Sequence, residues 1–163
     1  MIAFINFEKR QNNVEKVKEL YFKAYTNALE RNQSEAMAYI VVQYSRFLAF
    51  KCSDPNRAVE IMNQAISKCF TNAEGSRGTK TLYLSYVNFL KHLEGQIPDT
   101  FSKIVQVFDK GIESGLSIED RAEIARFYIE YLQESSPSVS QLRSTEASLK
   151  QKGLLTFKPD GSR

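Results

Sequence analysis

The sequence offers few residues that could perform catalysis or bind a metal. His92 is the only histidine, and Lys91 precedes it near the end of an expected helix. A histidine at that place more often interacts with the helix dipole than acts as a general base. Cys52 and Cys69 are the only cysteines, and with one histidine they cannot complete a conventional zinc site. Two cysteines in a chain that can build a core without them favour reduced thiols over a disulfide.

Phosphate binding and acid–base chemistry find no better support. Gly75-Ser-Arg-Gly78 lacks the lysine that follows in a phosphate-binding loop, and we expect it to lie in a flexible polar loop over residues 71–79. Glu119 and Asp120 fall in the first turn of an expected helix, where negative charge offsets the dipole. The sequence therefore predicts a protein that is not an enzyme and holds no cofactor.

The charge balance argues against nucleic acid as a direct partner, and the short apolar runs argue against a membrane. The net charge is only +3. Basic residues such as Lys16 and Lys18 alternate with acids such as Glu15 and Glu19, as on a solvated helix face. We expect direct RNA contact to be weak or absent. The longest apolar run, residues 36–42, is too short to span a bilayer.

Pairs of aromatic residues three positions apart recur at intervals of about 40 residues. Two residues at this spacing lie on one face of a helix, so each pair predicts an anchor buried against another helix. Recurrence at this period is typical of a solenoid of helix pairs. The pairs, which we expect to form the repeat core, are Phe4/Phe7, Tyr44/Phe47, Tyr86/Phe89 and Tyr128/Tyr131.

A second pattern follows the aromatic pairs and supports the repeat. Three segments, residues 16–25, 57–66 and 103–112, align with two large apolar residues, then a small residue, then another large one. The small residue is Ala24, Ala65 or Gly111. A bulkier side chain at this position would push neighbouring helices apart, so these residues predict close helix packing.

These patterns predict an all-α fold, a right-handed superhelical solenoid of seven or eight antiparallel helices arranged in pairs. We expect helices over about 14–29, 34–51 and 80–93, and others starting after Asp54-Pro55 and Pro98-Asp99. Residues 117–120 and 138–141 resemble capping boxes for the last two. No segment alternates as a strand does. Residues 1–152 would form the helical domain, which begins inside a repeat and so suggests a fragment of a longer solenoid, and 153–163 a tail.

The end of the chain is unusually apolar for a free tail. Leu154, Leu155 and Phe157 follow the helix stop at Gly153. Two interpretations stay open, a frayed tail or an apolar segment docked on its own surface or a partner's. Because an end helix of a solenoid needs a polar cap or a partner, we expect a two-fold dimer built by the last two helix pairs. The candidate interface residues are Phe127, Tyr128, Tyr131, Val139, Leu142, Leu149, Leu154, Leu155 and Phe157.

Aromatic-rich first helices that alternate with second helices of basic, apolar and small residues resemble HAT (half-a-TPR) repeats of RNA-processing scaffolds. Within that group the chain is similar to the C-terminal repeats of the pre-mRNA-processing factor 39 family, over about Ala3 to Leu149. The motifs that carry this likeness are Thr81-Leu-Tyr-Leu84, Phe108-Asp-Lys-Gly111, Ser114-Gly-Leu-Ser-Ile118, Arg121 and Phe127-Tyr-Ile-Glu-Tyr-Leu132. The chain departs from the family in having no tryptophan and no long N-terminal repeat array.

The resemblance implies a nuclear, non-catalytic scaffold of the small nuclear ribonucleoprotein that recognises the 5′ splice site. It implies pairing with a second copy or with a related HAT-repeat protein, and contact with other proteins of that particle. A dimerising HAT-repeat scaffold of a pre-mRNA 3′-end cleavage factor is the first alternative. A generic TPR-like module that binds a peptide in its groove is the second.

Overall fold

The protein is helical throughout the part that its structure, a computed structural model, describes: residue 5 and residues 14–31, 34–69, 76–135 and 138–155. The helices are α2 (Val14–Glu30), α3 (Ser34–Phe50), α4 (Pro55–Cys69), α5 (Ser76–His92), α6 (Thr100–Ile112), α7 (Ile118–Ser135) and α8 (Val139–Gln151). Within these ranges there is no strand, only an isolated bridge between Glu94 and Ile97. The prediction of an all-α fold is confirmed.

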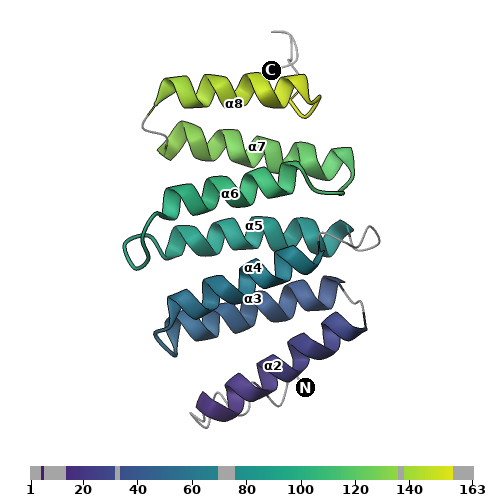
Figure 1. Cartoon of the computed structure of the whole chain (residues 1–163), viewed down its shortest axis with the longest axis vertical. Coiled ribbons are helices and arrows are strands. Elements are labelled where there is room, and N and C mark those ends of the chain that lie inside the picture. Colours follow the sequence, from purple (N-terminus) through teal and green to yellow (C-terminus); the bar gives the residue numbers. More distant parts are fainter. Residues whose placement is uncertain (1–4, 6–13, 32–33, 70–75, 136–137, 156–163) are drawn as a thin grey trace.

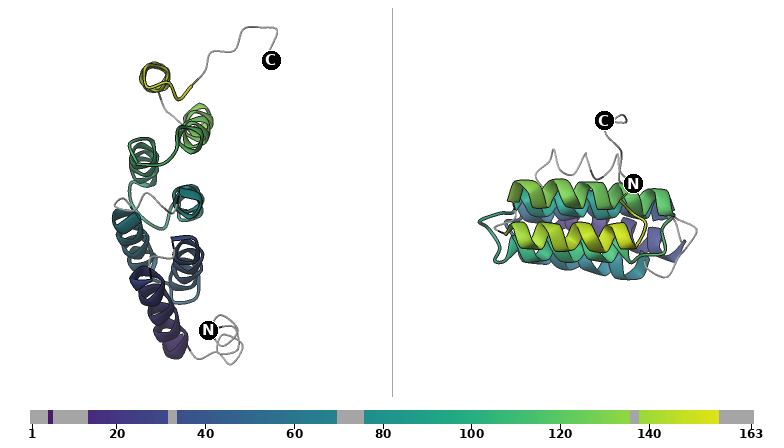
Figure 2. Two further views of the ribbon diagram at one scale, coloured as in Figure 1. Left: turned by 90° about the vertical axis from the view of Figure 1, so that its right-hand side faces the viewer. Right: turned by 90° about the horizontal axis from the view of Figure 1, so that it is seen from above.

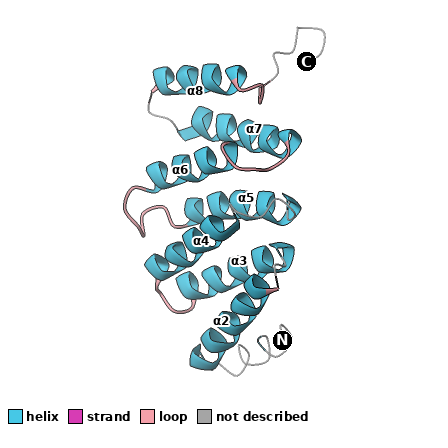
Figure 3. Cartoon of the chain, turned by 45° about the vertical axis from the view of Figure 1, so that its right-hand side comes forward, coloured by secondary structure: helices cyan, strands magenta, loops and turns pink. Residues whose placement is uncertain are grey.

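The helices are stacked in two layers along the long axis of the molecule. Each helix packs against the next one in the sequence, and α5 also packs directly against α3 and α7. In the left panel of Figure 2, which views the helices end-on, α3, α5 and α7 form one layer, and α2, α4, α6 and α8 form the other. The first and last of these helices, α2 and α8, lie at opposite ends of the stack (Figure 1). Loops join the helices at the edges of the stack (Figure 3).

Short polar motifs set several helix starts, as the sequence indicates. Pro55 opens α4, and the Asp54 carboxylate before it accepts a hydrogen bond from the Arg57 amide at 3.1 Å. The Ser117 hydroxyl accepts one from the Asp120 amide at 3.2 Å before α7. The Ser138 hydroxyl accepts one from the Gln141 amide at 3.4 Å before α8.

The start of α5 corrects one sequence prediction. The expected flexible loop covers residues 71–79, but α5 already begins at Ser76, so that residues 76–79 form its first turn. Small polar residues and Gly78 are tolerated there, because the first four amides of a helix have no intrahelical partner and side chains can serve them instead. Gly75 and the rest of the expected loop, residues 71–75, lie outside the described residues.

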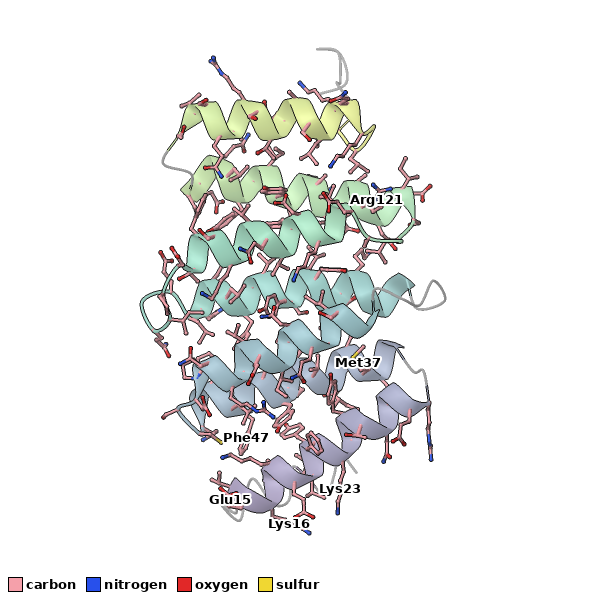
Figure 4. The ribbon with its side chains drawn as sticks, in the orientation of Figure 1. Glu15, Lys16, Lys23, Met37, Phe47 and Arg121 are labelled. Atoms are coloured by element: carbon pink, nitrogen blue, oxygen red, sulfur yellow. The ribbon has the colours of Figure 1, made fainter. Side chains whose placement is uncertain are left out.

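Six residues of the aromatic pairs are buried between helices. Tyr44, Phe47, Tyr86, Phe89, Tyr128 and Tyr131 each expose 7% or less of their surface. Phe4 and Phe7 lie outside the described residues. The buried rings make contacts from one helix to another. The Tyr21 ring of α2 stacks on the Tyr44 ring with centres 5.5 Å apart, and its centre lies 5.7 Å from that of Phe47. Figure 4 shows Phe47 on the side of α3 that faces α2.

The aligned apolar positions of α2, α4 and α6 are buried as well. The large residues Leu20, Ile61 and Val107 expose at most 6% of their surface. The aligned small residues lie where helices approach closely. A Cβ added at Gly111, for example, would lie 3.2 Å from two side-chain carbons of Ile124 on α7. That distance is shorter than ordinary carbon–carbon contact, so any side chain at this position would have to displace Ile124.

We expect the core to depend on Phe47 far more than on Phe50, although both are phenylalanines of α3. Phe47 is 5% exposed and Phe50 is 48% exposed. Phe47→Ala should lower the unfolding free energy by about 3–5 kcal/mol, because it removes a buried ring and leaves a cavity. Phe50→Ala should cost less than about 1.5 kcal/mol, since it loses mainly one edge contact with Phe89. Urea denaturation followed by circular dichroism measures both; equal losses would contradict the packing described here.

Candidate interaction surfaces

The residue types that could perform catalysis or bind a metal do not come together in the described part of the chain. His92 keeps within its own helix, with Nδ1 at 2.8 Å from the carbonyl oxygen of Asn88. Cys52 is a free, half-buried thiol whose pKa is raised by burial, and the Cys69 side chain lies outside the described residues. Among the side chains that the structure places, no three of the metal-binding types gather in a possible metal site. No described helix is both long and apolar enough to cross a membrane.

Four of the candidate interface residues are already used inside the chain. Tyr128 stacks on Phe108 of α6 at 4.8 Å with nearly parallel rings, and Tyr131 meets the same ring at 6.0 Å. Leu149 and Leu154 are each 3% exposed. These side chains lie beneath the surface, which corrects the expectation that they form an interface themselves.

The backbone at the end of α8 explains why Leu154 is buried. Gly153 has a positive φ of 74°. The Leu154 amide donates to the Leu149 carbonyl at 2.9 Å, and the Gly153 amide donates to the Lys150 carbonyl at 3.0 Å. This is a Schellman ending, in which the residue after the glycine returns to contact the last turn of the helix. The docked alternative therefore holds for Leu154, on its own chain.

Four other candidate residues remain accessible. Phe127 is 37% exposed and Val139 is 65% exposed, while Leu142 and Leu155 are half-buried. Phe157 lies outside the described residues. The exposed positions fall on two separate surfaces: Phe127 belongs to the layer of α3, α5 and α7, and Val139 lies on the end helix α8, which packs mainly against α7.

Phe127 borders a hollow of about 370 Å³ between α5 and α7. Leu84 and the buried Phe108 give it apolar walls, and Asn88 supplies an amide. The Arg126 guanidinium lies 5.3 Å from the centre of the Phe127 ring. The remaining lining residues are Thr81, Ser85, Val87 and Lys91. This hollow cannot be predicted from the sequence, because a helical pattern shows which face is polar but not where two helices leave a gap.

A smaller, polar hollow of about 180 Å³ lies on the opposite side, beside α4 and α6. Lys103 and Lys110 of α6 line it. Tyr86 also borders it, and its hydroxyl donates to the Asn63 side-chain oxygen at 2.9 Å. This tyrosine links α5 to α4, and burial raises the pKa of its phenol.

Polar contacts fix α7 on its neighbours. The Lys80 ammonium lies 2.9 Å from a Glu123 carboxylate oxygen and 3.4 Å from one of Asp120. Hydrogen bonding to Glu123 raises the Lys80 pKa, although burial opposes the shift. Arg121, labelled in Figure 4, donates from Nε to the Ile112 carbonyl at 2.6 Å and so caps the end of α6.

Tyr128 carries a similar link to the end helix. Its hydroxyl hydrogen-bonds to the side chain of Asp109 on α6 and to that of Thr145 on α8. Burial raises the pKa of this phenol, and the negative charge of Asp109 adds to the shift. Tyr128 thus joins three consecutive helices, as expected of a repeat-core residue, and its ring is not available to the expected dimer interface.

Comparisons with known proteins give no family assignment. The chain matches none of the protein families with which it was compared, and none of the curated proteins.

The buried phenols of Tyr86 and Tyr128 predict a loss of stability in alkali. An unfolded tyrosine ionises near pH 10, whereas Tyr86 and Tyr128 keep their protons to higher pH in the folded chain. The contribution of these two phenols to the unfolding free energy is therefore fully present below about pH 10. Above it, each tyrosine should remove about 1.4 kcal/mol of unfolding free energy per pH unit, until its folded pKa is reached. Urea denaturation at pH 9.0 to 11.5 measures this fall, and Tyr86→Phe should make it shallower.

The same experiment has an optical readout. Of the eight tyrosines, those that stay protonated in the folded chain should titrate only as helicity is lost. If absorbance shows all eight ionising below pH 11 while circular dichroism stays unchanged, the burial of these phenols is wrong.

Proposed function

We propose that the chain is a right-handed superhelical solenoid of antiparallel helix pairs and acts as a non-catalytic, HAT-type protein-interaction scaffold. The observation that carries the proposal is that equivalent positions make equivalent contacts. Tyr21 of α2 meets the aromatic pair of α3, and Phe108 of α6, at the matching position, meets the pair of α7. Met62, which occupies this position in α4, is fully buried.

The small residues that align in α2, α4 and α6 support the same arrangement. Ala24 and Ala65 are buried at 6% and 0% exposure, and Gly111 is buried at the same position of α6. Three helices with the same large, small and large residues turned inward are what a repeat requires, because each unit buries its apolar face only against its neighbours. An irregular bundle has no reason to keep the same residue sizes at one spacing.

We further propose that the scaffold belongs to the nuclear particle that recognises the 5′ splice site. The support is the sequence resemblance over residues 79–134, which fall on α5, α6 and α7. Large residues of its motifs, such as Tyr83 and Phe108, are 1% exposed. They are therefore packing residues, which supports the repeat class more strongly than the particle.

The proposed partner is a second copy of the chain or a related HAT-repeat protein. The end helix α8 has only α7 as a substantial neighbour. It carries the exposed Val139 and the half-buried Leu142, which packs partly against the core. An uncovered apolar position on an end helix is stabilised by a symmetric partner, with a total buried area above about 1,000 Å².

Sedimentation equilibrium tests the self-association. We expect the chain to dimerise at tens of micromolar and Val139→Asp with Leu142→Asp to make it monomeric, because two buried charges would oppose the contact. Ser140→Asp is the matched control, since Ser140 is exposed on the same turn. A wild-type chain that is monomeric at this concentration contradicts the proposal. A dimer that survives the double substitution places the interface elsewhere.

Recovery of the tagged chain from nuclear extract tests the particle. We expect the small nuclear RNA of the 5′-splice-site particle to be enriched at least about tenfold over the other spliceosomal RNAs, as a stable component would require. Enrichment of 3′-end cleavage factors instead would favour the alternative scaffold. Equal recovery of all small nuclear RNAs would contradict both the assignment and its specificity.

A further inference from the structure

The outer face of the layer formed by α3, α5 and α7 carries a polar row that crosses all three helices. The buried tyrosines Tyr44, Tyr86 and Tyr128 hold equivalent places in these helices. The residue two positions after a buried one points to the opposite side of a helix. Those residues are Arg46, Asn88 and Glu130, and all three are exposed.

The row has a cation at one end, an amide in the middle and a carboxylate at the other end. Because α3 packs on α5 and α5 packs on α7, the three positions lie in line across the layer, one helix apart. Closely packed helices are about 8–10 Å apart, so with the gap between α5 and α7 the row spans at least about 20 Å. An extended peptide rises about 3.3 Å per residue, and about six residues would cover it.

The 370 Å³ hollow lies beside the centre of this row. Asn88 lines it together with Leu84 of the same helix and Phe127 of α7. Its volume falls within the range of about 300–1,000 Å³ of pockets that enclose small ligands or side chains. Thr81 and Ser85 add hydroxyls along α5. An apolar cavity edged by hydroxyls and an amide suits an apolar side chain with its peptide backbone.

We propose that this face binds an extended peptide segment with an acidic residue at one end, an apolar side chain at the centre and a basic residue at the other end. The acidic residue lies near Arg46, the apolar side chain enters the hollow against Phe127, and the basic residue lies near Glu130. The Asn88 amide can donate to and accept from the peptide backbone at the centre. Binding at this face goes beyond the proposed scaffold function and does not depend on dimerisation through α8.

The carboxylates at the α7 end of the row, rather than the cations Lys91 and Arg126 beside the hollow, favour a peptide over single-stranded RNA. Phe127 and Asn88 could also contact a base, and Lys91 lies at the edge, 5.3 Å from the Tyr131 ring centre. However, Glu130 and Glu134 stand on the same exposed side of α7. Carboxylates at this end repel a phosphate backbone, whereas a peptide with a basic residue there is attracted.

Selection from a random twelve-residue peptide display library tests the proposal without a guess at the ligand. On the wild-type chain, enriched peptides should carry an acid and a base about five to six residues apart with an apolar residue between them. Arg46→Glu should change only the preferred acid to a base, and Glu130→Arg only the preferred base to an acid. The double variant should select peptides of reversed polarity.

The strongest wild-type peptide, made synthetically, gives the affinities. Phe127→Ser and Asn88→Ala should each weaken its binding by at least about tenfold, as expected for central contacts. The matched control is Lys110→Glu with Glu113→Lys, an exposed charge swap in the other layer, which should leave binding unchanged. Val139→Asp should also leave it unchanged, which separates this site from the proposed dimer. Melting curves establish that each variant is folded.

Three results would overturn the proposal. One is a library in which no peptide depends on Phe127 or Asn88. Another is a charge preference that stays the same after both swaps. The third is binding of a ten-nucleotide uridine RNA that requires Arg46 and Phe127 and competes with the selected peptide, because the face would then serve nucleic acid.

Discussion

The aromatic pairs can be buried only between helices, and the rest of the structure depends on this constraint. Tyr44 and Phe47 need Tyr21 from the preceding helix, and Tyr128 needs Phe108 in the same way. A helix carrying two large rings on one face cannot hide them alone, so each must lie between others. The stack is therefore as stable as its contacts between neighbours, and it leaves one face of every helix exposed to solvent.

The sequence predicted those features that depend on residues close together in the chain. The period of the aromatic pairs and the sizes of the aligned residues were enough to predict the all-α fold. Asp54, Ser117 and Ser138 marked helix starts through hydrogen bonds to residues three positions further along. Features that depend on the space between helices were not predictable. The hollow beside Phe127 arises from the distance between α5 and α7, which no single helix encodes.

The corrections at Tyr128 and Leu154 have the same physical origin. The sequence places Tyr128 and Leu154 at a partner's surface because Tyr128 belongs to the last two helix pairs and Leu154 to the apolar segment that follows them. In the structure Tyr128 bonds to Asp109 and Thr145, and the Schellman ending at Gly153 turns Leu154 back onto Leu149. Apolar residues near a chain end are thus first used to close the last helix, and only what remains exposed is open to a partner.

This order of use separates the two surfaces by their chemistry. On the end helix the exposed apolar residue is Val139, an aliphatic side chain whose neighbour one turn along the same face is the exposed Arg143. On the layer of α3, α5 and α7, the exposed ring of Phe127 is accompanied by hydrogen-bonding groups and opposite charges. A broad symmetric contact needs area more than direction, whereas a row from Arg46 to Glu130 imposes a direction on its ligand. The end helix therefore suits a like partner, and the layer face suits a short, oriented segment of an unlike one.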